Sequence, residues 1–264
     1  MSDDEGGGSL YVLSAVLLTP AQFPSILGDD FAEACALLGV APSGEGYGLV
    51  LGQDEEGARW TVVVDDVSLV ATAIASWDCG MDYDLSPDER SIVISLAGWP
   101  LELSVSATGI PEPHDPEQGA DGTGRVPLAP PSAEVWGPVQ RRMGADQIAR
   151  EWADWRERVA TDGGAAAAAH PGLARALEEA LEYTRTPPPP GRVRSSFAGE
   201  GARALRVDGP GWSLVARTGE TGGPDAAFVL LDEEPSEVLT VPHEGHHDLS
   251  QLLAALDRVA VRPA

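Results

Sequence analysis

The sequence predicts an α+β protein made of two small antiparallel-sheet units, each with a flanking helix, joined by a helical middle segment. Three observations predict it. At 46–64, two apolar runs flank the polar turn QDEEGA, which is a hairpin pattern. A second hairpin pattern at 202–217 turns at DGPG, and its returning strand again opens on Trp followed by Ser or Thr. Between the hairpins, apolar residues from Ile148 to Val159 recur at spacings of four, three and four, which is the spacing of one helix face.

The first unit is expected at 9–107, after a disordered segment at 1–8. Its elements are expected, in order, as a strand at 10–18, a helix at 31–38, the hairpin at 46–64 and a second hairpin from 91–96 and 101–106. Asp29 or Asp30 caps the helix and Gly39 ends it. The apolar run at 67–75 fits a strand or a helix, because its length does not decide, and an acidic loop is expected at 77–90.

Composition marks two linkers around the helical segment at 132–185. Residues 108–131 are rich in Pro, Gly, Asp and Glu and cannot bury enough apolar surface to offset ordering, so a flexible linker is expected. The second linker, 186–194, contains four consecutive prolines and is stiff. Between the linkers, Asp146 is expected to cap one helix, and a second helix is expected at 173–183.

The second unit is expected at 195–264. After its hairpin come two short strands, at 227–231 and 237–241. Asp248 followed three residues later by Gln251 has the spacing of a capping box, and four leucines at 249, 252, 253 and 256 supply the apolar face of a final helix. The order of helix, loop, Trp-bearing hairpin and second hairpin repeats that of the first unit, which favours two related units.

The charge of the chain is strongly acidic. Its 264 residues include 42 Asp and Glu against 17 basic residues, all of them Arg, for a net charge of −25. Residues 1–131 hold 22 acidic and three basic residues, whereas 132–264 hold 20 and 14. Such a field repels nucleic acid and attracts basic partners, so direct nucleic-acid binding is excluded and a basic protein partner is expected. The alternative is that the carboxylates only keep the protein soluble.

Compartment and source follow from composition. Arginine without lysine, together with abundant Ala, Gly and Pro, is typical of a GC-rich bacterial genome. Two cysteines, Cys35 and Cys79, are too few for a disulfide framework. The acidic start of the chain is unlike a signal peptide, and the apolar run at 10–18 is about half the length needed to cross a bilayer. A cytoplasmic protein without membrane contact is expected.

One motif has the residue types of a metal site. The run HEGHH at 243–247 matches H-E-x-x-H, which binds zinc when both histidines face the metal from one helix. Here Pro242 precedes the motif, Gly245 interrupts it, and the capping box starts the helix only at Asp248. A polar loop is therefore expected and no metal, with His243, His246 and His247 kept as the alternative ligands.

Other chemistry is not indicated. Residues 82–88 alternate oxygen-bearing side chains like the start of a calcium loop, but Pro87 stands where Gly is needed and Val93 where Glu is needed. No phosphate-binding Gly loop, G-x-S-x-G elbow or kinase signature is present. We therefore expect no cofactor and do not expect an enzyme.

The function expected from these observations is binding of another protein. The leading hypothesis is an acidic neutraliser, of immunity or inhibitor type, that binds to the basic face of a toxin or nucleic-acid-handling enzyme. Its expected contact residues are the carboxylates Asp54, Glu55, Glu56, Asp65, Asp66, Asp78, Asp82, Asp84, Asp88 and Glu89, with Trp60 and Trp77 as anchors or, alternatively, as core residues. One alternative is an adaptor or secretion chaperone that uses Trp152 and Trp155; another is a zinc-dependent hydrolase at HEGHH.

Overall fold

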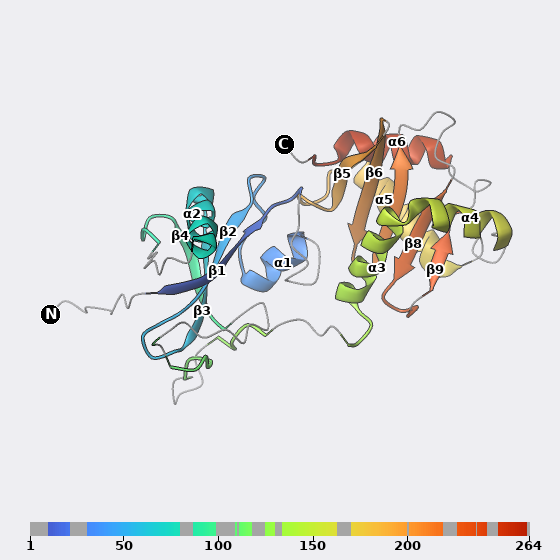
Figure 1. Ribbon diagram of the computed structural model, residues 1–264. Helices are drawn as coiled ribbons and strands as arrows, with labels where there is room; N and C mark the ends of the chain where they lie inside the picture. Colours follow the sequence, from blue (N-terminus) through green and yellow to red (C-terminus); the bar gives the residue numbers. More distant parts are fainter. Residues whose placement is uncertain are drawn as a thin grey trace. The chain divides into compact units, whose positions relative to one another are not determined.

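The computed structural model describes most of the chain and has an α+β fold (Figure 1). The described residues are 10–21, 31–79, 87–98, 109, 111–117, 125–129, 134–162, 170–199, 201–218, 226–235, 237–241 and 248–262, without the side chains of 76–78, 159–162 and 218. Two separate antiparallel sheets, of four and five strands, confirm the expected fold class. The chain forms two compact units: unit 1 contains 1–19 and 45–131, and unit 2 contains 20–44 and 132–264.

Unit 1 contains a four-stranded sheet in the order β1-β2-β3-β4. Its elements are β1 (Tyr11–Leu18), β2 (Tyr47–Gln53), β3 (Arg59–Val64), α2 (Val67–Asp78) and β4 (Ile92–Ala97). The expected hairpin is confirmed, because Gly48 pairs with Val64 and Gln53 with Arg59. The apolar run at 67–75 is a helix rather than a strand, and it extends to Asp78, into the stretch expected to be a loop.

Helix α2 packs on one face of this sheet. Val70 and Ala73 of the helix contact Ala15 of β1, next to a cluster that includes Val50 and Val62. The helix approaches closely over Gly48, where an added Cβ would lie 2.5 Å from Val70 Cγ2. A glycine is therefore needed at this position of an otherwise apolar strand.

Parts of the expected flexible linker are hydrogen-bonded to this sheet. His114 pairs with Ala58, and Leu128 pairs with Gly98, each in a parallel bridge. The Leu128 N–H donates to the carbonyl of Ala97 at 2.9 Å. The backbone groups of these two residues therefore find partners beside the strands, within the stretch for which composition predicts a flexible linker. The expected strand at 101–106 lies outside the described residues.

Unit 2 contains a five-stranded antiparallel meander with helices on both faces. Its elements are α1 (Phe31–Leu38), α3 (Pro138–Arg150), α4 (Trp152–Asp162), α5 (Pro171–Tyr183), β5 (Val193–Gly199), β6 (Ala202–Gly209), β7 (Trp212–Thr218), β8 (Ala227–Leu231), β9 (Val238–Thr240) and α6 (Leu249–Val259). The sequence did not indicate β5. The hairpin at 202–217, the strands at 227–231 and 237–241, and the helices at 31–38 and 173–183 are confirmed to within a few residues.

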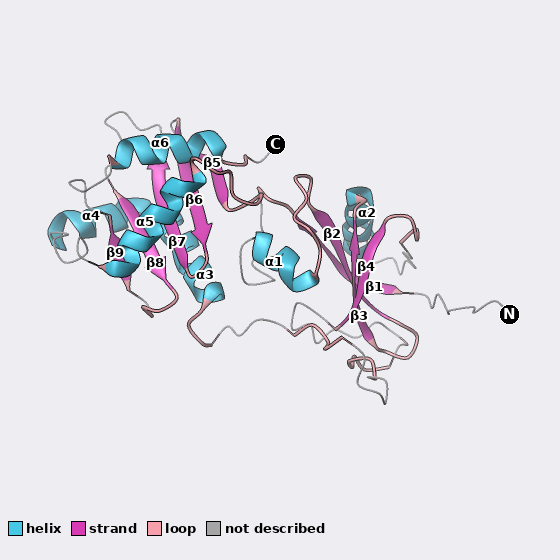
Figure 2. Ribbon diagram, turned by 180° about the vertical axis from the view of Figure 1, so that it is seen from behind, coloured by secondary structure: helices cyan, strands magenta, loops and turns pink. Residues whose placement is uncertain are grey.

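The core of unit 2 lies on the two faces of this sheet. On one face, Leu205 and Leu214 pack with residues of α5 and α6, including Leu253. On the opposite face, Ile148 of α3 and Trp152 of α4 pack on Val215, Phe228 and Leu230. Figures 1 and 2, which view the molecule from opposite sides, show α3 and α5 on opposite faces of the strands.

Helix boundaries show two errors and two correct predictions. The single helix expected to carry Ile148 through Val159 is two helices, because α3 ends at Arg150 and α4 begins at Trp152. Asp146 does not cap a helix: α3 begins at Pro138, after Gly137, so Asp146 lies within it and pairs with Arg206. The proline has no N–H to leave unpaired in the first turn, which makes it a good helix start. Asp248 does cap α6, accepting a hydrogen bond from Gln251 N at 3.2 Å, and Gly39 follows α1 with φ 72°. The expected caps Asp29 and Asp30 lie outside the described residues.

The two units differ in the order of their elements. In unit 1 helix α2 separates β3 from β4, whereas in the described part of unit 2 the five strands follow one another without an intervening helix. Across the described residues, no helix combines the length and the apolar character needed to cross a membrane.

Candidate functional site

Among the carboxylates singled out from the sequence, those whose side chains the structure describes lie in two groups at opposite ends of β3. Residues 54–56 form the turn that leads into the strand, and Asp65 and Asp66 follow its last residue. Asp88 and Glu89 precede β4, whose Ile92 pairs with Val64 at that same end of β3. At about 3.3 Å per residue, the six residues of β3 separate the two groups by roughly 20 Å. The described carboxylates therefore form two separate groups, and their role as contact residues stays a prediction.

In the first group, which we call the hairpin turn (54–57), one of the three carboxylates stabilises the turn through hydrogen bonds. The Asp54 carboxylate accepts hydrogen bonds from Ala58 N at 2.8 Å and Glu56 N at 3.1 Å. Its second oxygen accepts from Trp60 Nε1 at 3.0 Å. Asp54 thus fixes the turn and the indole, whereas Glu55 and Glu56 remain exposed.

Basic groups lie beside the hairpin turn. Arg59 Nη2 is 2.6 Å from Asp115 Oδ1. The His114 ring lies between the carbonyls of Glu56 and Asp115. Its hydrogen bonds to these two carbonyls, the one to Asp115 most, raise the pKa of His114 above its ordinary 6.5. The negative charge at this end of β3 is therefore partly compensated within unit 1.

The second group, which we call the acidic end, consists of four exposed carboxylates: Asp65, Asp66, Asp88 and Glu89. A hydrogen bond from Asp65 N to Ser91 O, at 3.0 Å, holds the two segments together. Ser68 donates to Asp66 Oδ1 from its hydroxyl at 2.6 Å and from its N–H at 2.9 Å. These hydrogen bonds, the side-chain one most, lower the pKa of Asp66 below its ordinary 3.8.

The two tryptophans expected as anchors, Trp60 and Trp77, do not both lie at the acidic end. Trp60 is half-buried against the Val50 and Val62 cluster, at the opposite end of β3. Trp77 and Asp78 lie in the last turn of α2, and their side chains are not among those described. Asp82 and Asp84 lie outside the described residues. The described part of the acidic end is therefore a polar surface.

The tryptophans of the adaptor alternative lie against the sheet of unit 2. Trp152 is 3% exposed, and its ring meets the edge of Phe228 at 5.3 Å between centroids. Trp155 meets the same ring at 6.0 Å and is half-buried, with the Arg158 guanidinium 4.7 Å from its centroid. The burial of Trp152 assigns it to the core, so little of its ring is left for a partner.

The histidines of the zinc alternative, His243, His246 and His247, lie outside the described residues. Where the structure is described, no three His, Cys, Asp or Glu side chains come together as metal ligands would. Cys35 is buried and Cys79 is exposed, and neither forms a disulfide.

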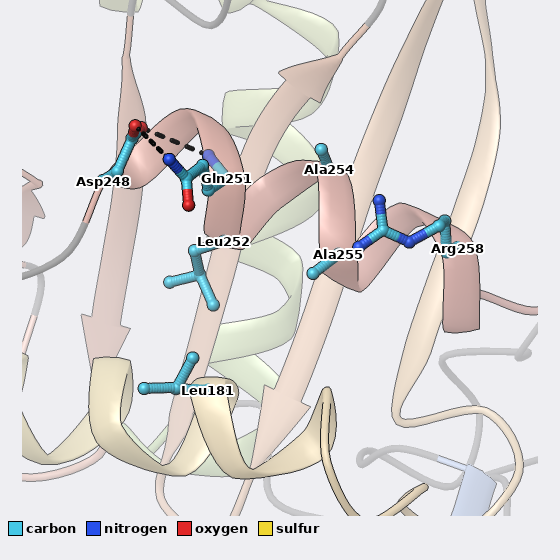
Figure 3. Close-up of a pocket in the computed structure, with 7 residues that line it drawn as sticks. All are labelled: Leu181, Asp248, Gln251, Leu252, Ala254, Ala255 and Arg258. Atoms are coloured by element: carbon cyan, nitrogen blue, oxygen red, sulfur yellow. Dashed lines mark hydrogen bonds between the residues drawn. The ribbon is translucent and has the colours of Figure 1, made fainter.

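A surface groove of about 420 Å³ lies between α5 and α6 (Figure 3). Leu181 and Leu252 point toward each other across it, and Asp248 and Arg258 lie at its two ends. Both oxygens of Asp248 already accept from Gln251. The groove has a mixed lining without a convergent set of catalytic groups, and the sequence did not indicate it because it arises only when two distant helices pack together.

The most strongly perturbed groups lie inside unit 2, and sequence reasoning missed them. Asp208 is fully buried, pairs with Arg194, lies 3.7 Å from Arg206 Nη2, and accepts from Ser213 Oγ at 2.5 Å. Burial alone would raise the pKa of Asp208, but Arg206, Arg194 and Arg142 together hold it well below its ordinary 3.8. We call Arg142, Arg194 and Arg206 the arginine cluster.

The same burial acts on the cations. Arg142 is 4% exposed, and its burial lowers its pKa to about 9, an effect that Asp208 opposes and Arg194 and Arg206 reinforce. A signal was present in the sequence: Arg206 and Asp208 lie two apart on a strand and so share one face, the face opposite to Val207. Because these charges are enclosed, we assign them to the folding of unit 2.

Comparison with known proteins assigns no family to the chain. No protein-family model matches the chain, and neither a curated protein nor a solved structure matches it.

Proposed function

We propose that this protein is a non-catalytic acidic binding protein whose acidic end contacts a basic protein, as an immunity- or inhibitor-type neutraliser does. The observation that supports the proposal is the division of charge between the units. Unit 1 contains 19 acidic residues and three arginines, a net charge of −16. Unit 2 contains 23 acidic residues and 14 arginines, a net charge of −9.

Several arginines of unit 2 form ion pairs with carboxylates of the same unit. Ion pairs in unit 2 include Arg141 with Asp232 at 2.8 Å, Arg206 with Asp146 at 2.5 Å, and Arg192 with Glu33 at 3.3 Å. Three arginines cannot do the same for the 19 carboxylates of unit 1. The surplus of unit 1 is therefore available to an external cation, and the acidic end is a described group of four exposed carboxylates within it.

A basic protein fits this surface better than a small cation or a nucleic acid. Exposed carboxylates spread over two segments offer several separate contacts to Arg and Lys side chains, which strengthens electrostatic steering and fixes the orientation of docking. Phosphate groups would be repelled. Contacts of this kind are screened within about 8 to 10 Å at ordinary ionic strength, so partner binding should weaken steeply as salt is added.

The test compares two double variants with the same net charge. Asp65→Asn with Glu89→Gln removes two charges from the acidic end, while Glu55→Gln with Glu56→Gln removes two from the hairpin turn. Asp66 and Asp88 are left unchanged because their carboxylates accept local hydrogen bonds. The partner is first captured by the full-length protein at low salt and identified, and its affinity for each variant is then measured by calorimetry.

We expect the variant of the acidic end to bind roughly 2- to 30-fold more weakly, from about 0.2–1 kcal/mol per exposed pair, and to show a shallower dependence on salt. The variant of the hairpin turn should bind like the unmodified protein. Equal weakening in both variants would mean that total charge, and not the acidic end, governs binding. A partner without a basic surface, or binding that is indifferent to salt, would refute the proposal.

A further inference from the structure

Residues 111–117, which we call the strap, lie along the hairpin turn and are held there by their backbone. His114 N donates to Gly57 O at 3.1 Å, and Arg59 N donates to His114 O at 2.8 Å. The strap lies close to the turn at Gly57, whose φ is +89° and where an added Cβ would lie 2.9 Å from the carbonyl oxygens of Pro111 and Glu112. The contact is therefore tight and specific in register.

The His114 ring adds a second link between the strap and the hairpin turn. Its Nε2 lies 3.0 Å from the carbonyl oxygen of Glu56, and its Nδ1 lies 2.9 Å from the carbonyl oxygen of Asp115. A carbonyl oxygen can only accept, and a neutral imidazole has a single N–H. Only the doubly protonated ring can donate to both carbonyls at once. When the ring loses a proton, one nitrogen presents a lone pair to a carbonyl oxygen.

We propose that protonated His114 is a pH-sensitive clamp that holds the strap on the hairpin turn, and that deprotonation of the ring loosens the strap. The link across the turn, from Nε2 to Glu56, spans 58 residues of sequence, whereas the bond from Nδ1 is local to the strap. Loss of the Nε2 proton therefore removes a long-range hydrogen bond directly, whereas loss of the Nδ1 proton leaves a lone pair facing the Asp115 carbonyl within the strap.

The charged groups around the ring act in both directions. The Asp54 carboxylate favours the protonated ring, and the Arg59 guanidinium disfavours it, although Arg59 itself pairs with Asp115. Because the pKa of His114 is raised in the folded state, the stabilisation is fully present below the ordinary value of 6.5 and is lost as pH rises through the folded-state pKa. The strap should thus loosen on the alkaline side of 6.5.

The experiment joins two measurements on the full-length protein. A pH titration followed by NMR gives the pKa of His114 in the native protein and in urea. Native-state hydrogen exchange of the His114 and Arg59 amides, corrected for intrinsic chemistry, gives the opening constant of the strap at each pH. Linkage requires the opening constant to rise tenfold in total for each unit by which the native pKa of His114 exceeds its pKa in urea. The rise measured by hydrogen exchange must therefore equal the rise calculated from the two pKa values.

Two variants separate the clamp from general effects of pH. His114→Gln is always neutral, so we expect its strap to stay at the higher opening constant with no further dependence on pH; because the ring is exposed, the variant should fold normally. His170→Gln is the control in unit 2, where Nδ1 of His170 accepts a hydrogen bond from Gly172 N at the start of α5. It should leave exchange in the strap unchanged at every pH.

Three results would overturn the proposal. His114 could titrate at or below its value in urea, which would remove the linkage. The exchange of the strap amides could show no dependence on pH beyond intrinsic chemistry. Finally, the dependence on pH could persist in His114→Gln, which would assign it to another group. This test requires no binding partner, so its outcome does not depend on the proposed function.

Discussion

The buried carboxylate of Asp208 gives the sharpest prediction about stability. Asp208→Asn keeps the size of the side chain and removes its charge. The carboxylate is fully buried on β6, pairs with Arg194, and lies 3.7 Å from Arg206. Without it, the arginine cluster keeps its positive charges inside unit 2, including that of Arg142, which is 4% exposed.

The expected loss of stability is about 3–5 kcal/mol, the usual result of removing one partner of a buried ion pair and leaving the other charged. Asp146→Asn is a matched control, because Asp146 also pairs with Arg206, at 2.5 Å, but its side chain is 52% exposed. For an exposed pair we expect about 0.2–1 kcal/mol. The dependence of stability on pH also has a definite direction. Because folding lowers the pKa of Asp208, the stabilisation of the folded state by this carboxylate is present above its ordinary pKa of 3.8 and is lost as pH falls through the folded-state pKa.

Urea denaturation followed by tryptophan fluorescence measures both variants, and hydrogen exchange in β6 and β7 assigns the transition to unit 2. With a slope of roughly 2 kcal/mol per molar urea, Asp208→Asn should lower the midpoint by about 1.5–2.5 M without changing the slope. The reasoning would be refuted if Asp208→Asn destabilised the protein no more than Asp146→Asn. It would also be refuted if combining Asp208→Asn with Arg206→Met gave strictly additive losses, because charges in contact must couple.

Three further predictions follow from individual contacts. Arg142→Met should destabilise unit 2 less than Arg206→Met does, measured by urea denaturation, because burial already disfavours the charge of Arg142 and lowers its pKa to about 9. Trp152→Ala should cost about 3–5 kcal/mol in the same assay, because the ring is 3% exposed and packs on Phe228, so any loss of binding in this variant must be corrected for unfolding. Gly57→Ala should speed amide exchange in the strap without lowering the urea midpoint of unit 2, because a Cβ would collide with strap carbonyls.

Local signals in the sequence predicted most of the fold. The hairpin at 46–64, the helix at 173–183 and the cap at Asp248 each depend on residues close together in the chain, and all three are confirmed. The run at 67–75 could not be assigned because a short, mainly apolar stretch suits either element. Its helical form depends on a distant strand: Val70 packs over Gly48, which leaves room for a helix.

The candidate site was only half predictable, because it depends on which segments meet. The predicted hairpin at 46–64 already separates 54–56 from 65–66 by one strand, but nothing in the sequence indicated that Asp88 and Glu89 lie at the same end of β3 as 65–66. It also placed His114 in a linker, since nothing near it in the sequence predicts a bridge to Ala58. Asp146 illustrates the same limit: its residue type favours a cap, but its partner, Arg206, is 60 residues away.

Solubility and partner binding place different demands on where carboxylates lie. Solubility depends on net charge and is indifferent to position, so it treats Glu55 with Glu56 and Asp65 with Glu89 as equivalent pairs. A binding surface does not, because steering and docking depend on the local potential. Arg59 reduces that potential at the hairpin turn, and the raised pKa of His114 lets the ring add to this effect as pH falls, whereas the acidic end groups four exposed carboxylates. If both double variants bind the partner as tightly as the unmodified protein does, the acidic surplus serves solubility, and the position of these carboxylates carries no function.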